Sequence, residues 1–491
     1  MGRLGQVTRS FSIPADRLAI IAADGVFSHL DLAETADRVA CALRTTGAAP
    51  GADLAEARVA FLVPPSFAHV VISRAIWLAG GIAVPLAVSH PPAELEHVIR
   101  DSQASIVVGS GWKAEALEAI SVSVGARFLR TPDLIAQDVP HLPKVTISPD
   151  RRALIVYTSG TTGKPKGVVT THGNVAAQIA SLLEAWEWTS DDRALLVLPL
   201  HHVHGIINVL GCAIAAGAAC EMLPQFDVEA AWERLASGEV TVFSAVPTIY
   251  TRLIDSWQGA PAHVRRARSA GAGRARLMMS GSAALPIGTL DRWREITGHT
   301  LLERYGMTEI GMALSNPLHG ERRPGFVGGP LPGVDVRLVE GELEVRGPGV
   351  FCEYWGRPEE THASFHDGWF RTGDTAVVEG GAYRLLGRTN TDIIKTGGFK
   401  VSALEIEAAL REHPLIRDCA VVGIPDSDWG ERVCAAVEVI ENATLPSGEL
   451  QQWLKARLAA YKVPKSILAV DDLPRNAMSK VVKPEVARLF G

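Results

Sequence analysis

The sequence predicts an α/β protein in which a large N-terminal domain of flanked β-sheets, with a β-rich subdomain, precedes a small mobile α+β domain. Short apolar strands alternate with helical patterns over residues 1–150, which is typical of parallel sheets covered by helices. A loop of glycines, hydroxyls and lysines follows a buried strand near residue 157, and a new pattern starts near residue 390. The 491 residues have room for two or three folding units, so we divide the chain into 1–389 and 390–491.

The composition favours a small-molecule partner. A formal net charge of −6 carries no basic excess, which argues against nucleic acid. The six cysteines have neither metal-like nor disulfide-like spacing, so reduced thiols in the cytoplasm are expected. The longest apolar stretch, 206–220, is too short to span a bilayer, which predicts a buried helix and no membrane partner. We expect a monomer or a homodimer.

The first 150 residues supply scaffold rather than chemistry. Residues 30–43 have the period of an amphipathic helix, and 59–63 and 105–108 are short apolar strands. No catalytic constellation stands out among them, so we expect the functional residues after this region.

The loop after the strand at 153–157 has the composition of a polyphosphate site. Glycine lets backbone N–H groups turn toward an anion, hydroxyls donate further hydrogen bonds and lysines supply positive charge. Lys164 is followed by Pro165 rather than by Ser or Thr, so the loop is not a Walker A motif. A helix is expected to begin near Asn174. The candidate phosphate-binding residues are Thr158, Ser159, Gly160, Thr161, Thr162, Lys164 and Lys166.

The run from Tyr157 to Val168 resembles the signature loop of the adenylate-forming superfamily, which includes acyl-CoA synthetases, firefly luciferase and the adenylation domains of peptide synthetases. The resemblance implies that ATP and a carboxylic acid react to form an acyl-adenylate, which a thiol then attacks. It also implies that the loop residues bind ATP, with Thr158 acting in catalysis and at the metal site.

Three histidines follow the strand that ends at Pro199, in the string Pro199-Leu200-His201-His202-Val203-His204-Gly205. A metal site is one interpretation, but no carboxylate or cysteine lies at typical ligand spacing, which favours a pocket role. In the superfamily a histidine at the position of His202 closes the acyl site against the nucleotide, so His202 is a catalytic and substrate-binding candidate. The full string resembles the malonyl-CoA synthetase branch and makes His204 a candidate lining residue of a polar acyl pocket.

Arg252 lies near the start of a helix that Pro247 is suited to open after the strand 240–246. Such a helix begins at the carboxyl edge of the sheet, where α/β folds bind ligands. A second carboxylate on the substrate would need a fixed guanidinium, because burying an unpaired anion is costly. The resemblance to malonyl-CoA synthetases makes Arg252 our candidate for this contact. The alternative is a surface ion pair with Asp255 at i, i+3.

Two further segments add nucleotide contacts. The small residues of Ser280-Gly281-Ser282 permit close backbone approach, and in the superfamily this turn faces the adenine. In the second signature, Tyr305 offers a flat face for a purine, Thr308 a hydroxyl for the α-phosphate and Glu309 a hard oxygen ligand for Mg²⁺ and catalysis. The ATP-binding candidates of this segment are Arg304, Tyr305, Gly306, Met307 and Thr308.

The acyl site and the ribose site complete the large domain. Gly306, Met307 and Met312 border the acyl site in this resemblance, although methionines more often fill gaps in a core. Asp374 follows a glycine in a turn and Arg388 ends a later strand. Their order and separation match the superfamily, which assigns both to the ribose, whereas in isolation they would be ordinary turn residues.

The C-terminal part contributes the mobile elements. We place the hinge at Asn390, and the helix 403–411 with the strands 418–422 and 435–440 predicts a small α+β domain. In the resemblance, this domain swivels to serve two half-reactions in turn.

Two loops of this domain carry chemistry. Gly397, Gly398 and Lys400 border the CoA tunnel in the resemblance. Lys480 bridges the reacting carboxylate and the α-phosphate, which makes it both catalytic and ATP-binding. Ser479 stands where most relatives have glycine, and it stiffens that loop.

These features predict a ligase that uses ATP, Mg²⁺ and CoA to convert malonate, or methylmalonate, into its CoA thioester with release of AMP and pyrophosphate. Developing negative charge at the phosphate explains the need for Mg²⁺, Lys480 and the hydroxyl-rich loop. The alternatives are a ligase for a short-chain or aryl monocarboxylic acid, a luciferase-like oxidase and an ATP-binding protein without catalysis. The presence of Glu309 and Lys480 argues against the last of these.

Overall fold

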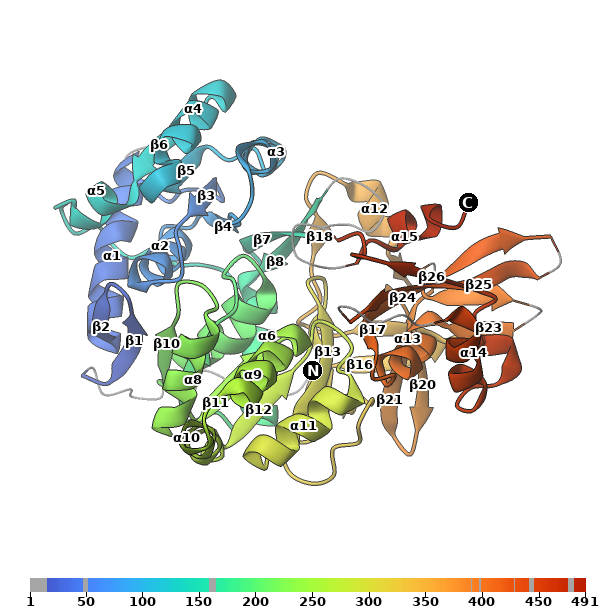
Figure 1. Ribbon diagram of the computed structural model, residues 1–491. Helices are drawn as coiled ribbons and strands as arrows, with labels where there is room; N and C mark the ends of the chain where they lie inside the picture. The colour runs from blue at the N-terminus through green and yellow to red at the C-terminus, as the bar shows by residue number, and fades with distance from the viewer. Residues whose placement is uncertain are drawn as a thin grey trace.

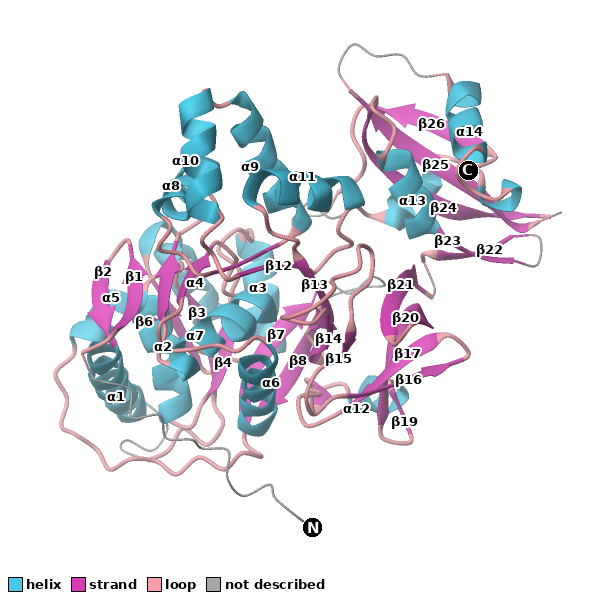
Figure 2. Ribbon diagram, turned by 90° about the horizontal axis from the view of Figure 1, so that it is seen from below, coloured by secondary structure: helices cyan, strands magenta, loops and turns pink. Residues whose placement is uncertain are grey.

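The computed structural model describes residues 16–46, 52–158, 165–389, 391–396, 399–427, 429–440, 446–475 and 481–491. Two large sheets with helices around them form most of the molecule, and two smaller sheets follow (Figures 1 and 2). The last sheet and its helices lie at the right of Figure 1. This is the mixed α/β architecture that the sequence predicts.

The first sheet has seven strands in the order β18-β8-β7-β4-β3-β5-β6. Its central strands run parallel, whereas β8 is antiparallel to both β7 and β18. The predicted helix 30–43 and strands 59–63 and 105–108 correspond to α1, β3 and β5. The strands are β3 (Arg58–Leu62), β4 (Ile82–Pro85), β5 (Ile106–Gly109), β6 (Arg127–Arg130), β7 (Arg152–Thr158), β8 (Lys166–Thr171) and β18 (Glu353–Tyr354). The helices are α1 (His29–Thr46), α2 (Phe67–Leu78), α3 (Pro92–Asp101), η1 (Gly111–Lys113), α4 (Ala114–Val124) and α5 (Thr131–Ala136).

The second sheet has nine strands in the order β15-β14-β13-β12-β11-β9-β10-β1-β2. The strands from β13 to β1 are parallel, and β2, β14 and β15 are antiparallel edges. Since β1 pairs with β10, residues 18–28 belong to this sheet and not to the one formed by the rest of the first 150 residues. The strands are β1 (Leu18–Ala22), β2 (Gly25–Ser28), β9 (Arg193–Leu196), β10 (Ala219–Met222), β11 (Val242–Ala245), β12 (Leu277–Ser280), β13 (Leu302–Met307), β14 (Gly311–Ser315) and β15 (Gly329–Pro330).

The helices beside the second sheet start where local signals predict. Thr171 and Asn174 form a reciprocal capping box, so α6 begins at His172. The helices are α6 (His172–Ala185), η2 (His204–Gly211), α7 (Cys212–Ala216), α8 (Val228–Ser237), α9 (Pro247–Gly259), α10 (Ala262–Ala272) and α11 (Ile287–Thr297).

The buried helix predicted for 206–220 is present up to residue 216, and only its C-terminal end is wrong. The π-helical turn η2 continues into the short helix α7, which ends where Gly217 adopts a φ of 73°. The remaining residues lead into β10. Periodicity alone cannot separate a buried helix from a buried strand within a continuous apolar run.

The β-rich subdomain is a five-stranded sheet in the order β16-β17-β20-β19, with β21 paired to β20. Its apolar core includes Val168 and Tyr305 from the two large sheets, which joins the subdomain to both. Its elements are β16 (Asp335–Val339), β17 (Glu342–Arg346), α12 (Pro358–Ala363), β19 (Phe365–His366), β20 (Trp369–Glu379) and β21 (Ala382–Arg388).

The C-terminal sheet has the order β23-β22-β25-β24, with β26 paired to β25, and it has two apolar core clusters of its own. The predicted helix 403–411 is α13, and the two predicted strands lie within β24 and β25. The elements are β22 (Ile393–Thr396), β23 (Phe399–Ser402), α13 (Ala403–Arg411), β24 (Ile416–Asp426), β25 (Gly430–Val439), α14 (Ser447–Lys455), η3 (Ala460–Lys462), β26 (Ser466–Val470) and α15 (Lys483–Arg488). The boundary at 389/390 stays a prediction, because Asn390 lies outside the described residues.

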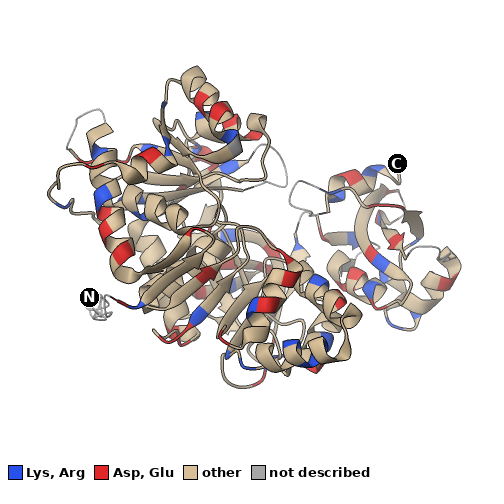
Figure 3. Cartoon of the chain, turned by 60° about the vertical axis from the view of Figure 1, so that its left-hand side comes forward, with Lys and Arg blue, Asp and Glu red and all other residues tan. Residues whose placement is uncertain are grey.

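Charged residues of both signs are scattered over the helices and strands (Figure 3). Among the described residues, no helix combines the length and the apolar character that crossing a membrane requires.

Candidate active site

The candidate site lies at the carboxyl edge of the nine-stranded sheet, where the turns after β9, β11, β12 and β13 meet. β13 divides this site, because successive side chains of a strand point to opposite faces. Three groups of side chains occupy it. They are the histidine cluster (His204, Ser244, Ser282 and Arg304), the aspartate cluster (Tyr305, Asp374 and Arg388) and the glutamate cluster (Lys166, Glu309 and Tyr354).

His204 is the centre of the histidine cluster, and it is buried at the start of η2. Its Nδ1 lies 3.1 Å from Ser282 Oγ. Its Nε2 lies 2.8 Å from Ser244 Oγ and accepts a hydrogen bond from Arg304 Nη2. Burial, together with the charge of Arg304, lowers the pKa of His204 well below its ordinary value. The ring is therefore neutral, with its proton on Nδ1 and its Nε2 lone pair directed at Arg304.

Arg304 is a buried cation without a buried anion. Its exposed fraction is 2%, and burial lowers its pKa to about 10. Its Nε and Nη1 have no hydrogen-bond partner, and within the described part of the chain no carboxylate forms a salt bridge with it. Gly281 makes room for the side chain, since a Cβ added there would overlap Arg304 Nη1. Such a guanidinium is suited to bind an incoming anion.

The aspartate cluster, in contrast, contains its own ion pair. Arg388 Nε lies 3.1 Å from Asp374 Oδ1, and the two residues face each other across β20 and β21. The Tyr305 hydroxyl donates to Asp374 Oδ2 at 2.5 Å. Burial raises the pKa of Asp374, and the positive charge of Arg388 opposes that rise. Tyr305 is 8% exposed, and its role as a flat face for a purine stays a prediction.

Glu309 is the buried carboxylate of the glutamate cluster. The Tyr354 hydroxyl donates to its Oε1 at 3.0 Å, and burial raises the pKa of Glu309. Among the described residues, no Lys, Arg or His forms a salt bridge with Glu309, so its carboxylate has a hydroxyl partner and no cation. With Oε1 engaged, Oε2 is the oxygen that a hard divalent cation would take. The site therefore fits Mg²⁺, which binds proteins through one or two carboxylates.

The predicted phosphate loop is described only at its two ends. Thr158 and Lys166 face each other where β7 and β8 pair, so they form the base of a hairpin. Lys166 pairs with Glu360 of α12, and its Nζ lies 5.3 Å from the centre of the Tyr354 ring. Other predicted residues lie outside the described residues, namely Ser159, Gly160, Thr161, Thr162, Lys164, Asn390, Gly397, Gly398, Ser479 and Lys480, together with the side chain of Lys400.

Arg252 stays the predicted partner of a second carboxylate. It is exposed on α9, with its guanidinium carbon 4.9 Å from the centre of the Phe226 ring. Arg304, which the sequence assigns to ATP, is a buried guanidinium, and within the described part of the chain no carboxylate pairs with it. A residue pattern cannot reveal this burial, because it depends on which strand faces His204.

The remaining predicted residues lie around the clusters. His202 is half-buried, and its ring centre lies 4.2 Å from that of His201. Ser280 is fully buried at the end of β12, and its Oγ has no hydrogen-bond partner among the described residues, whereas Ser282 is exposed. Gly306, Met307 and Thr308 are half-buried at the end of β13 and in the turn after it.

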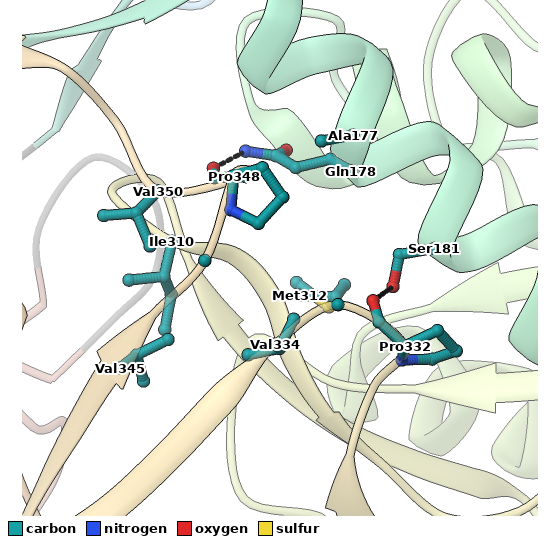
Figure 4. A pocket seen from close by; sticks show the side chains of 13 residues that line it. Ala177, Gln178, Ser181, Ile310, Met312, Pro332, Val334, Val345, Pro348 and Val350 are labelled. Atoms are coloured by element: carbon teal, nitrogen blue, oxygen red, sulfur yellow. Dashed lines mark hydrogen bonds between the residues drawn. The ribbon is translucent and has the colours of Figure 1, made fainter. Parts of the chain in front are cut away.

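The Met312 side chain packs directly against Gly306. A Cβ added at Gly306 would overlap the Met312 side chain, which is 6% exposed. Figure 4 shows Met312 beside a small cavity between α6 and the β-rich subdomain, with about 20 Å³ for a water-sized molecule. Gln178 and Ser181 of α6 cross that region to donate to Gly349 and Pro332 carbonyls (Figure 4). Met312 therefore fills the core beneath the site.

Three residues of the site have no assignment from the sequence. Ser244 carries a recognisable signal, because it is a polar residue in the otherwise apolar strand β11. Tyr354 and Glu360 carry none, since their positions depend on the pairing of β18 with β8. Pairing between such distant segments is set by the tertiary structure.

Comparison with known proteins gives a consistent result. The family model described as AMP-binding enzyme matches residues 8–355, and the model of the AMP-binding enzyme C-terminal domain matches residues 405–480. The chain is 46% identical over 516 residues to the mitochondrial malonate–CoA ligase of Bos taurus, covering 96% of this chain and 88% of that protein. It is 43% identical over 473 residues to the malonate–CoA ligase of Arabidopsis thaliana, covering 88% and 78%. The crystal structure of ATP-bound MatB from Rhodopseudomonas palustris superposes with a TM-score of 0.88, at 35% identity and with 98% of each chain covered.

Proposed function

The chain belongs to the AMP-binding enzyme family, and on that premise we propose that it is an ATP-dependent acid–thiol ligase that activates malonate or methylmalonate as an acyl-adenylate and transfers the acyl group to CoA. The observation that carries the choice of acid is Arg304, whose buried guanidinium has two nitrogens without a partner. Relatives named as malonate–CoA ligases support the same choice.

A dicarboxylic acid can neutralise the charge of Arg304, whereas a monocarboxylic acid cannot. The reacting carboxylate has to reach the α-phosphate of ATP, so it is not available to neutralise a guanidinium buried beside His204. A second carboxylate on the same substrate is available, and a charge-assisted pair with Arg304 would satisfy the empty nitrogens.

The other members of the histidine cluster fix the direction of the anchor. The neutral His204 accepts from Arg304 Nη2, and the Ser244 hydroxyl donates to the same ring nitrogen, so the guanidinium plane is held from one side. Ser282 is exposed beside this pair, with its Oγ 3.1 Å from His204 Nδ1. We keep His202, Met307 and Gly306 as the wall between this pocket and the nucleotide.

For the nucleotide, we assign the ribose to Asp374 and Arg388 and the adenine to the turn at Ser280–Ser282. The phosphates belong to the loop 158–166 and to Thr308. Glu309 and Thr158 would hold Mg²⁺, which neutralises phosphate charge when it is bound. The residues themselves orient the triphosphate, and the buried position of Glu309 excludes water from that side.

The second half-reaction is assigned to the C-terminal residues 390–491. Lys480 would act in the adenylation pose, and Gly397, Gly398 and Lys400 would border the thiol in the other pose, with Asn390 as the hinge. A swivel is needed because Lys480 and a pantetheine arm cannot occupy the same approach to the acyl group.

The location and the assembly belong to the proposal as well. We propose a cytoplasmic monomer or homodimer. Since the Bos taurus relative is named as mitochondrial, cell fractionation should compare the soluble and the mitochondrial fractions. Light scattering of the purified protein gives its mass in solution.

The deciding experiment offers the enzyme a choice of acids. An equimolar pool of malonate, methylmalonate, acetate, butyrate and benzoate is incubated with ATP, Mg²⁺ and CoA, and the thioesters are identified by mass. We expect malonyl-CoA or methylmalonyl-CoA, with AMP and pyrophosphate in equal amount. A dominant monocarboxyl thioester would establish the alternative acid class, and oxygen uptake without CoA consumption would establish an oxidase.

A further inference from the structure

Tyr354 connects two parts of the site that are far apart in the sequence. Its hydroxyl donates to Glu309 Oε1 at 3.0 Å. Its backbone belongs to β18, which pairs antiparallel with β8 so that Tyr354 faces Val168. β8 begins at Lys166, directly after the predicted phosphate loop. The same residue therefore contacts the candidate metal ligand and the strand that supports the phosphates.

The position of the hydroxyl is fixed by several neighbours. The Tyr354 ring is 8% exposed and lies against the Phe351 ring, with centroids 4.7 Å apart. Lys166 Nζ lies 5.3 Å from the ring centre on account of its pairing with Glu360. The Trp355 N–H donates to the Gly167 carbonyl at 2.8 Å, which holds the backbone after Tyr354. A ring held in this way has little freedom to move its hydroxyl.

Glu309 is anchored at both its backbone and its side chain by this one segment. The Phe351 N–H donates to the Glu309 carbonyl at 2.7 Å, and Tyr354 holds Oε1 of the carboxylate. Partners of this kind fix the orientation of a metal-binding carboxylate, and their loss typically weakens metal binding by about 10- to 100-fold.

We propose that Tyr354 is a positioning residue that directs the Glu309 carboxylate at the Mg²⁺ of bound MgATP. The inference rests on the proposed function, in which Glu309 is a metal ligand. Tyr354 touches neither substrate nor metal in this role. It sets which oxygen of Glu309 is free and where that oxygen points relative to the phosphate loop.

The test compares Tyr354→Phe with Tyr383→Phe, a matched change in the same apolar core. ATP binding is measured by calorimetry with Mg²⁺ and with EDTA, and the Mg²⁺ dependence of malonate-dependent pyrophosphate exchange is measured in parallel. For Tyr354→Phe we expect MgATP affinity to fall and the half-saturating Mg²⁺ concentration to rise by about 10- to 100-fold. ATP affinity in EDTA and the kcat at saturating Mg²⁺ should stay within about twofold of wild type, as should every value for Tyr383→Phe. Thermal unfolding in EDTA checks that both variants are folded.

Two outcomes would overturn the inference. One is an unchanged Mg²⁺ requirement in Tyr354→Phe, and the other is an equal loss of ATP affinity with and without Mg²⁺, which would mark a general structural role. The double variant provides a third measurement. If Tyr354 acts through Glu309, adding Tyr354→Phe to Glu309→Gln should change the MgATP affinity little. A wild-type protein that binds MgATP without malonate-dependent exchange would contradict the proposed acid, and the calorimetry would still decide the role of Tyr354.

Discussion

The histidine cluster and the aspartate cluster are built from neighbouring residues of one strand, but they differ in how their charges are paired. Arg304 and Tyr305 are adjacent on β13 and point to opposite faces. On the Tyr305 face, Asp374 is paired with Arg388 inside the protein. On the Arg304 face, a guanidinium is buried against neutral partners. We call the aspartate cluster balanced, because its positive and negative charges pair within the protein. We call the histidine cluster unbalanced, because the charge of Arg304 would have to be neutralised by a ligand.

The largest effect is expected from Arg304→Met, which removes the unbalanced charge and keeps most of the side-chain length. Malonate would then bury its second carboxylate without a cation, which costs about 3–5 kcal/mol, or roughly 10²- to 10⁴-fold in kcat/KM. The free energy of unfolding of the ligand-free protein should rise by about 1–3 kcal/mol, because an uncompensated buried cation has been removed. Steady-state kinetics with malonate and acetate, and denaturant unfolding without ligand, measure the two quantities.

The opposite signs of these two changes are the diagnostic feature. A merely damaged core would lower both activity and stability. If Arg304→Met kept its preference for malonate over acetate, the comparison between the two clusters would lose its functional meaning.

The second effect concerns the balanced cluster. Asp374→Asn keeps the shape of the side chain but removes the charge that pairs with Arg388 and that we propose binds the ribose hydroxyls. Hydrogen bonds to a charged group contribute about 1.5–3 kcal/mol, so the KM for ATP should rise by roughly 10- to 100-fold. The ratio of kcat/KM between malonate and acetate should remain that of the wild type, since our proposal places the acid on the other face of β13. A change in that ratio would show that the two clusters are not independent.

The sequence predicts the balanced cluster better than the unbalanced one, and the reason is physical. Asp374 and Arg388 are recognisable because each belongs to a string whose order the superfamily shares, and β20 and β21 are adjacent in the chain. The sequence places the acid anchor on Arg252 because it follows a strand end, and the burial of a side chain cannot be predicted from such a position. Burial of Arg304 depends on Gly281, His204 and the pairing of β12 with β13, which only the folded chain brings together. For the same reason, strands with a local period were predicted well, whereas the pairing of β1 with β10 was not.

A smaller effect should appear in the pH dependence of ATP binding. Burial raises the pKa of Asp374 and Arg388 opposes the rise, so Arg388→Met should raise that pKa further. Asp374 accepts hydrogen bonds best when ionised, and affinity is lost as pH falls through its pKa. As the pH is lowered, the KM for ATP should therefore begin to increase at a higher pH in the variant than in the wild type. Arg346→Met, which removes an exposed partner of Asp335 in the same subdomain, is the control and should leave the profile unchanged.

The smallest effect is expected from Arg252→Ala, which tests the anchor that the sequence favours. Arg252 is exposed and its contact is with the Phe226 ring, an interaction that contributes about 0.5–1 kcal/mol at an exposed site. Its removal should change kcat/KM for malonate by less than about threefold and leave the preference over acetate, butyrate and benzoate intact, in pyrophosphate exchange run beside Arg304→Met. If Arg252→Ala lost the preference for malonate and Arg304→Met kept it, Arg252 on α9 would be the residue that binds the second carboxylate. It would also mean that a group other than the acid neutralises Arg304. A buried charge without a partner in the folded chain would then not identify the place where the substrate binds.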